Sequence, residues 1–185
     1  MSDLRDPVEP RPGVFVHSAR DRELASVHWL LSAAPAIEEA RREWAESGIA
    51  VLRCGGLFTA IRISAGIVHA AAGTEEPAAV SDYLSRVLRG PVFADQASRR
   101  FYALVPASTQ RLSLWHGTTV PEAECLGTNC FIGVPHPGRD NPRNYRCHWV
   151  VPMDGPADLC SPYAVTQLLS YGRFRLAAME SAADE

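Results

Sequence analysis

Cysteine and histidine side chains gather in the second half of the sequence, where their types suit a zinc site. Cys125 and Cys130 have four residues between them, and Cys147, His148 and Cys160 follow. Structural zinc is held by thiolates and imidazoles in tetrahedral sets, with paired cysteines about two to four residues apart. Cys125, Cys130, Cys147 and Cys160 are therefore a candidate zinc set. In the alternative interpretation, these cysteines are free thiols that act as small buried hydrophobic residues.

Arginine and tyrosine side chains offer a second chemistry, the binding of phosphates and bases. The segment 86–111 holds five arginines, Arg86, Arg89, Arg99, Arg100 and Arg111, against the single acid Asp95. A guanidinium binds phosphate as a forked donor with a fixed charge, and an aromatic ring can stack on a base. The alternative is a solvated face on which each arginine pairs with a nearby carboxylate.

Other catalytic chemistries lack their motifs. The chain has no lysine, which excludes a lysine Schiff base and the P-loop. No Gly-x-Ser-x-Gly motif is present, although several histidines and serines leave a hydrolase of another type as an open alternative. No cofactor is expected unless the cysteines hold zinc.

The elements that must position these side chains follow from apolar spacing and from glycine and proline punctuation. Gly55 and Gly56 are interpreted as a hairpin turn between two strands. In the strand over 57–63, alternation places Phe58, Ala60 and Arg62 on one side. The same rule separates Phe101 from Tyr102, and the tyrosine is the better choice for an exposed role. Helices are predicted over 18–32, 35–48, 64–73, 74–90 and 162–171, and strands over 49–53, 57–63, 91–94, 100–105, 112–115, 130–134 and 148–151.

Helices dominate the first half of the chain and strands the second, which favours an α+β fold. We expect a single domain over residues 14–176, with a mainly antiparallel central sheet, flanking helices and an N-terminal helical pair. Residues 1–13 are expected to form a flexible arm, and residues 177–185 an acidic tail. The long segment 135–144 between two strands is predicted to be a loop.

The length of 185 residues and the apolar content of 46% suit one globular domain with a real core. No apolar run is long enough for a membrane span, and the start of the chain has no signal-peptide pattern. The sequence therefore predicts a cytoplasmic protein with no membrane partner. With a net charge of −3, the whole molecule is not a strongly basic nucleic-acid binder.

Four segments, taken in order, resemble a known family. They are Gly48-Ile-Ala-Val-Leu, Gly56-Leu-Phe-Thr-Ala-Ile-Arg-Ile, Gly90-Pro-Val with Arg99-Arg-Phe-Tyr-Ala-Leu-Val-Pro, and Gly127 with Phe131-Ile-Gly-Val-Pro. The series, over about residues 40–138, is similar to the N-terminal domain of bifunctional DNA primase/polymerases of the archaeo-eukaryotic primase type, especially divergent actinobacterial members. The resemblance implies a primase-polymerase-like fold with an old nucleotide-binding cleft.

The residues that such a polymerase needs are replaced. The family's Asp-x-Asp pair would fall at about Thr59 and Ile61, its histidine near Arg100, and its third acid near Glu124. Threonine and isoleucine cannot supply the carboxylate oxygens that hold catalytic magnesium. The resemblance therefore implies a former metal site at Thr59, Ile61 and Glu124, and no polymerase activity.

The function expected from the sequence is that of a catalytically degenerate primase-polymerase-like protein. It would bind a nucleotide or single-stranded nucleic acid through Arg62, Arg99, Arg100 and Tyr102, or dock a replication or regulatory partner. One alternative is a regulatory protein-interaction module, for example a homo-oligomer, with no nucleic-acid role. The other is a small enzyme of unrecognised chemistry. The fold alone does not separate these hypotheses.

Overall fold

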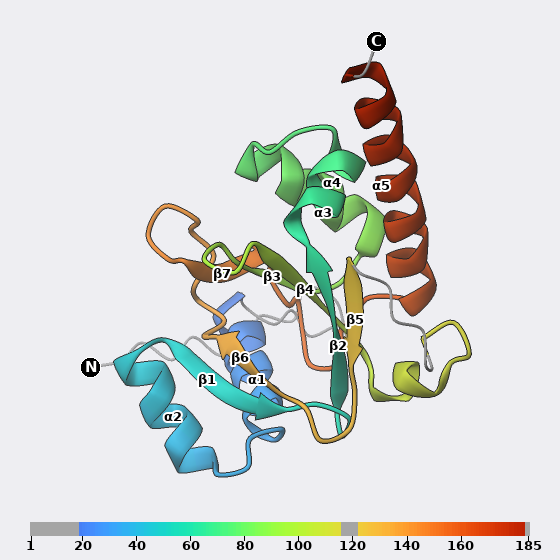
Figure 1. Cartoon of the computed structure of the whole chain (residues 1–185). Coiled ribbons are helices and arrows are strands. Elements are labelled where there is room, and N and C mark those ends of the chain that lie inside the picture. Colours follow the sequence, from blue (N-terminus) through green and yellow to red (C-terminus); the bar gives the residue numbers. More distant parts are fainter. Residues whose placement is uncertain (1–18, 116–121, 184–185) are drawn as a thin grey trace, which may run out of the picture.

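The computed structural model describes residues 19–115 and 122–183 and confirms an α+β fold with an antiparallel sheet and an N-terminal helical pair (Figure 1). None of the helices in these two ranges is long and apolar enough to cross a membrane. The helices are α1 (Ala19–Leu31), α2 (Ile37–Glu46), α3 (Ala65–Ala72), α4 (Pro77–Leu88) and α5 (Pro162–Ala183), with one 3-10 helix, η1 (Ala107–Arg111). The strands are β1 (Ile49–Arg53), β2 (Phe58–Ser64), β3 (Val92–Asp95), β4 (Arg100–Pro106), β5 (Ala123–Leu126), β6 (Phe131–Pro135) and β7 (Cys147–Val151).

Five strands form the central sheet in the order β5-β2-β4-β3-β7, and every neighbouring pair is antiparallel. Residues opposite each other in such pairs point to the same face, so the register defines rows of side chains across the sheet. One row crosses all five strands: Glu124, Arg62, Tyr102, Phe93 and Trp149. This row decides which side chains can act together.

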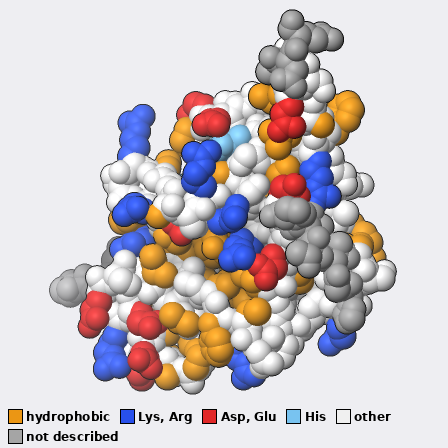
Figure 2. Space-filling model, in the orientation of Figure 1, with side chains coloured by type: hydrophobic (Ala, Val, Ile, Leu, Met, Phe, Trp, Pro, Cys, Tyr) orange, Lys and Arg blue, Asp and Glu red, His pale blue; other side chains and the backbone are white. Residues whose placement is uncertain are grey.

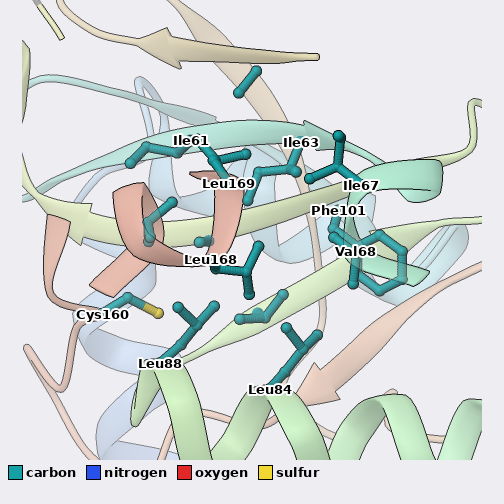
Figure 3. Packing of buried hydrophobic residues seen from close by; sticks show 14 of the residues in the cluster. Ile61, Ile63, Ile67, Val68, Leu84, Leu88, Phe101, Cys160, Leu168 and Leu169 are labelled. Atoms are coloured by element: carbon teal, nitrogen blue, oxygen red, sulfur yellow. The ribbon is translucent and has the colours of Figure 1, made fainter. Parts of the chain in front are cut away.

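Helices α3, α4 and α5 cover one face of the sheet, at the upper right of Figure 1. In Figure 3, Leu168 and Leu169 of α5 lie beside Ile61 and Ile63 of β2, and α4 closes the cluster from the other side. Gly172 lies in the α3–α5 contact, because a Cβ atom there would come within 2.5 Å of the Ile67 carbonyl oxygen. This apolar cluster is the larger core, and we call its side of the sheet the helix side.

The opposite face is partly covered by a smaller unit made of α1, α2 and a two-stranded antiparallel sheet of β1 and β6. We call this unit the N-terminal lobe, although β6 comes from later in the chain. Two tryptophan side chains anchor β6: the Trp44 and Trp149 indole N–H groups donate to the carbonyl oxygens of Val134 and Pro135, each at 3.0 Å. The lobe therefore has a fixed position against the sheet.

Several sequence-based expectations need correction. Gly55 and Gly56 do not form a hairpin, because β1 pairs with β6 while β2 pairs with β4 and β5. Residues 112–115 form bends and turns after η1 instead of a strand, and β5 was not predicted. The last helix continues through Gly172 to Ala183, so residues 177–183 are helical. The expected arm, residues 1–13, lies outside the described residues.

Candidate functional site

The main candidate site lies where the N-terminal lobe stops covering the sheet. Along one face of β2, Phe58 and Ala60 have no exposed surface, because they pack under the lobe. Two residues further on, Arg62 passes the edge of this cover, and 42% of its side chain is exposed. A cavity of about 860 Å³ opens there between the sheet, β6 and the segment 136–146. We call it the central groove.

The wall of the central groove is formed by several elements that are far apart in the sequence. Arg62, Phe93 and Tyr102 come from the sheet, and Phe131, Ile132 and Gly133 come from β6. The remaining wall is the loop before β7. Its side chains at the groove are Arg139, Asn144, Tyr145 and Arg146. Figure 2 shows basic side chains gathered near the middle of this face, with hydrophobic ones around them.

Arg62 is paired in the structure. Its guanidinium forms a hydrogen-bonded ion pair with the carboxylate of Glu124, the residue opposite it on β5. The alternative interpretation, in which each arginine pairs with a nearby carboxylate, therefore holds for Arg62. More than a third of both side chains is exposed, so water screens the pair and its net contribution to stability is small.

Tyr102 occupies the position next to Arg62 across β4 and is half-buried. Its ring stacks on that of Phe93, with centroids 4.7 Å apart and planes 9° apart. Phe93 in turn meets Trp149 edge to face at 5.4 Å. Phe101, by contrast, is buried on the helix side, so Tyr102 is the one of the two that reaches the groove. The orientation of the Tyr102 ring is therefore fixed by its stacking on Phe93, which in turn packs against Trp149.

The loop before β7 supplies arginines that the sequence analysis did not select. The Arg139 guanidinium lies over the Tyr145 ring, 4.6 Å from the centroid. The Arg146 carbonyl oxygen accepts a hydrogen bond of 2.9 Å from the Gln96 N–H, which ties the loop to the β3–β4 turn. The Pro/Gly/Asn/Arg composition of this loop was the available signal, but no local pattern says where a loop folds back.

The central groove carries more positive than negative charge. Its wall holds Arg62, Arg139 and Arg146 against one acid, Asp95. Within residues 19–115 and 122–183, no carboxylate lies within 4.0 Å of the guanidinium of Arg139 or Arg146. The carboxylate of Asp95 also stabilises the β3–β4 turn, because its Oδ1 accepts a hydrogen bond from the Ala97 N–H at 3.0 Å. Among the described residues, the groove thus has two arginines without a carboxylate partner, beside an aromatic surface.

The other two expected phosphate-binding residues, Arg99 and Arg100, line a different cavity. This cavity has a volume of about 720 Å³ and lies between the α3–α4 connection, the β3–β4 turn, β7 and the 140–143 segment. We call it the helix-side cavity. The structure therefore brings Arg62 together with Tyr102 in the central groove, and Arg99 together with Arg100 in the helix-side cavity.

Two histidines also line the helix-side cavity. His148 is 5% exposed, and its Nδ1 atom has no hydrogen-bond partner among the described residues. Burial lowers the pKa of His148, and the Tyr145 backbone carbonyl and Asp140 only partly oppose this effect. His69 packs edge to face on Phe101 at 5.8 Å, and its Nδ1 lies 3.5 Å from Glu75 Oε1.

The positions of the former metal site do not converge. Thr59 and Ile61 are fully buried on the helix side, whereas Glu124 lies on the opposite face beside Arg62. The Thr59 hydroxyl has no hydrogen-bond partner within the described chain. A hydroxyl and a hydrocarbon inside an apolar core supply none of the negative oxygens that a divalent metal needs. These residues therefore do not fit the divalent metal that the resemblance implied.

The four cysteines of the candidate zinc set are divided between the two faces of the sheet. Cys160 and Cys125 belong to the helix-side cluster, and Cys147 and Cys130 to the cluster under the N-terminal lobe. Burial raises the pKa of Cys147 and of Cys160 to about 12, and that of Cys125 to about 11. Across the two described ranges, no three His, Cys, Asp or Glu side chains converge as metal ligands.

Comparison with protein-family models, with curated proteins and with solved structures finds no match to this chain. The geometry of the two cavities is therefore the basis for inferring a function. Among the described residues, the wall of the central groove has three arginines and one acid, whereas that of the helix-side cavity has three arginines and four acids.

Proposed function

We propose that this chain binds a nucleotide or a single-stranded nucleic acid in the central groove, as a primase-polymerase-like protein without the metal-binding carboxylates. One observation carries the proposal: Tyr102 and three arginines share a groove that has a single acidic side chain in its wall. Binders of single strands combine a positively charged groove with aromatic side chains on which bases stack. Here the Tyr102 ring offers the stacking surface, and Arg62, Arg139 and Arg146 offer the phosphate contacts.

The rigidity of the groove supports the same function. The Tyr102 ring rests on Phe93, so little freedom is lost when a base stacks on it. Arg139 is held over Tyr145, and its guanidinium fills the space beside the Gly48 backbone, where even a Cβ atom would collide with it. A guanidinium in a fixed position binds a phosphate at a lower entropic cost than a free surface arginine.

The alternative hypothesis, a protein-interaction module, has exposed hydrophobic side chains on α5 in its favour. Tyr163, Tyr171, Phe174 and Met179 each expose more than 40% of their surface. Nothing in the described residues indicates what would cover them. The groove, in contrast, has a charge and a shape that specify its ligand, and it is the stronger basis for a function.

Fluorescence anisotropy with a labelled single-stranded oligonucleotide at low salt tests the proposal. Tyr102→Leu should weaken binding by about fivefold or more, because stacking is worth roughly 1–3 kcal/mol per base, whereas Tyr102→Phe should retain it. Arg146→Ala should weaken binding and reduce the salt dependence, because each neutralised phosphate adds about 0.7 to the slope on a single strand.

The matched control is Arg42→Ala, which removes an exposed arginine of α2 outside both cavities. It should leave binding unchanged. Two results would overturn the proposal: no binding by the wild-type protein at low salt, or equal losses for the Arg42 and Arg146 variants. The second result would mean that only the overall charge attracts the strand.

A further inference from the structure

The helix-side cavity is a second, partly open space, and it lies on the other face of the sheet from the central groove. Ala94, Phe101 and His148 lie in one row on this face, opposite the face of Phe93 and Tyr102. Among the lining residues with charge, only Asp95 borders both spaces. A ligand in this cavity would therefore be bound independently of one in the central groove.

The described wall of the helix-side cavity holds three arginines and four acids, and the arginines are not used in ion pairs. The guanidiniums of Arg99, Arg100 and Arg143 have no carboxylate within 4.0 Å in the described part of the chain. Three of the four acids in the wall already have partners. Glu75 faces His69 at 3.5 Å, Glu76 accepts from the Ala79 N–H at 2.7 Å, and Asp95 accepts from the Ala97 N–H at 3.0 Å. The acids keep their charge in these contacts, so the part of the wall that suits an anionic group is the set of free guanidinium donors of Arg99, Arg100 and Arg143.

His148 adds a second requirement on the ligand. Only 5% of its surface is exposed, and its Nδ1 lacks a hydrogen-bond partner within the described residues. Buried polar groups in folded proteins nearly always have a partner. Because burial lowers the pKa of this side chain, the imidazole is neutral at physiological pH and keeps one nitrogen lone pair as an acceptor. Nδ1 has almost no accessible surface, so a ligand group that donates an N–H or O–H hydrogen bond completes this site once the imidazole turns toward the cavity.

The rest of the wall sets the size and polarity of the ligand. Ala65, Val80, Ala94 and Phe101 provide an apolar surface beside the polar groups. The volume of about 720 Å³ is in the range of sites for small metabolites. Arg99 and Arg100 lie at the end of the β3–β4 turn and the start of β4, and Arg143 in the segment before β7. His148 is buried on the edge strand β7. An anionic group at the arginines and a donor group near His148 therefore belong to two ends of one molecule.

We propose that the helix-side cavity is a binding site for a small phosphorylated metabolite that also carries an N–H or O–H donor, the chemistry shared by mononucleotides and sugar phosphates. The phosphate binds Arg99, Arg100 and Arg143, and the donor group binds His148. This site is separate from the central groove, so its occupancy does not depend on the function proposed above.

Isothermal titration of the full chain with AMP, ribose 5-phosphate, adenosine, ribose and inorganic phosphate tests the proposal. Binding of AMP or of ribose 5-phosphate, each at least about tenfold tighter than its unphosphorylated counterpart and than inorganic phosphate, is the expected result. The compound that binds identifies the source as nucleotide or sugar phosphate. Absence of binding by both, or equal binding of inorganic phosphate, would overturn the proposal.

Variants locate the site. Arg143→Ala, at an exposed position, should weaken the binding of ribose 5-phosphate by about tenfold, whereas Arg146→Ala in the central groove should not change it. His148→Phe should also weaken it, and because this variant can fail to fold, a ligand-induced change in the His148 imidazole ¹⁵N shifts of the wild-type protein is the second measurement. An unchanged affinity in Arg143→Ala, or unchanged His148 shifts at saturation, would contradict the assignment.

Discussion

At the scale of single residues, Arg62 shows how the alternation of side chains along β2 directs one of them into the central groove. The sequence pattern correctly placed Phe58, Ala60 and Arg62 on one side of β2. Both faces of this strand are covered, which the pattern could not predict, because covering a face depends on elements from elsewhere in the chain. Arg62 is available to a ligand because the N-terminal lobe covers Phe93 and Trp149 of this row but leaves the Arg62 end exposed.

Glu124 is expected to restrain the groove, because its carboxylate occupies the Arg62 guanidinium. Glu124→Gln removes the negative charge and frees Arg62 for phosphate, so we expect tighter binding of a single-stranded oligonucleotide, by about two- to fivefold at low salt. Since 56% of the Glu124 side chain is exposed, the free energy of unfolding should change by less than about 1 kcal/mol. Anisotropy titrations and urea denaturation measure the two quantities. Weaker binding by this variant would show that Arg62 does not contact the strand.

The loop residues mark the limit of what the sequence reveals about the site. Arg62 and Tyr102 were each selected from readable strand alternation, and the structure places them opposite each other on β2 and β4. Arg139, Tyr145 and Arg146 were not selected, since their positions depend on hydrogen bonds between the loop and the distant β3–β4 turn. Arg99 and Arg100 follow a turn, and their shared cavity could not be inferred from the order of residues alone.

At the scale of elements, the errors of the sequence analysis come from long-range packing. Gly55 and Gly56 have the composition of a hairpin turn, but β1 finds its partner in β6, about eighty residues later. A local pattern contains no information about a partner that far away. Gly172 resembles a helix end for a similar reason, because an isolated glycine usually marks a C-cap. In this helix the missing side chain instead allows α5 to approach α3 closely.

Two glycine-to-alanine variants should distinguish a glycine that is needed for close helix packing from one that is not. Gly172→Ala should lower the free energy of unfolding by about 1–3 kcal/mol, because the new methyl group would meet the Ile67 backbone oxygen at 2.5 Å and push α5 away from α3. Gly66→Ala lies on the exposed side of α3 with nothing within 4 Å, so better helix propensity should raise stability by up to about 1 kcal/mol. Urea denaturation measures both changes. A stabilising Gly172→Ala would show that this helix contact is looser than the structure indicates.

At the scale of the whole molecule, one sheet carries two hydrophobic cores. Strands β2, β3 and β4 send alternate side chains into each of them: Ile61, Val92 and Ala103 into the helix side, and Ala60, Phe93 and Leu104 under the N-terminal lobe. Loss of either core would expose one face of the shared strands to water. We therefore expect the two halves to unfold together, as small single domains usually do.

Buried cysteines can test whether the two cores unfold together, because each core contains a buried cysteine. Cys160 lies in the helix-side core and Cys54 under the N-terminal lobe, and burial raises the pKa of each to about 12. Since the thiolate is the reactive form, both should resist alkylation at pH 8 in the folded protein and react once it unfolds. Short pulses of iodoacetamide along a urea series, read by peptide mass spectrometry, should give one midpoint for the two residues, equal to that of the loss of helix by circular dichroism. Labelling of Cys54 at clearly lower urea than Cys160 would instead mean that the N-terminal lobe detaches first, which would open the central groove while the helix-side cavity stays intact.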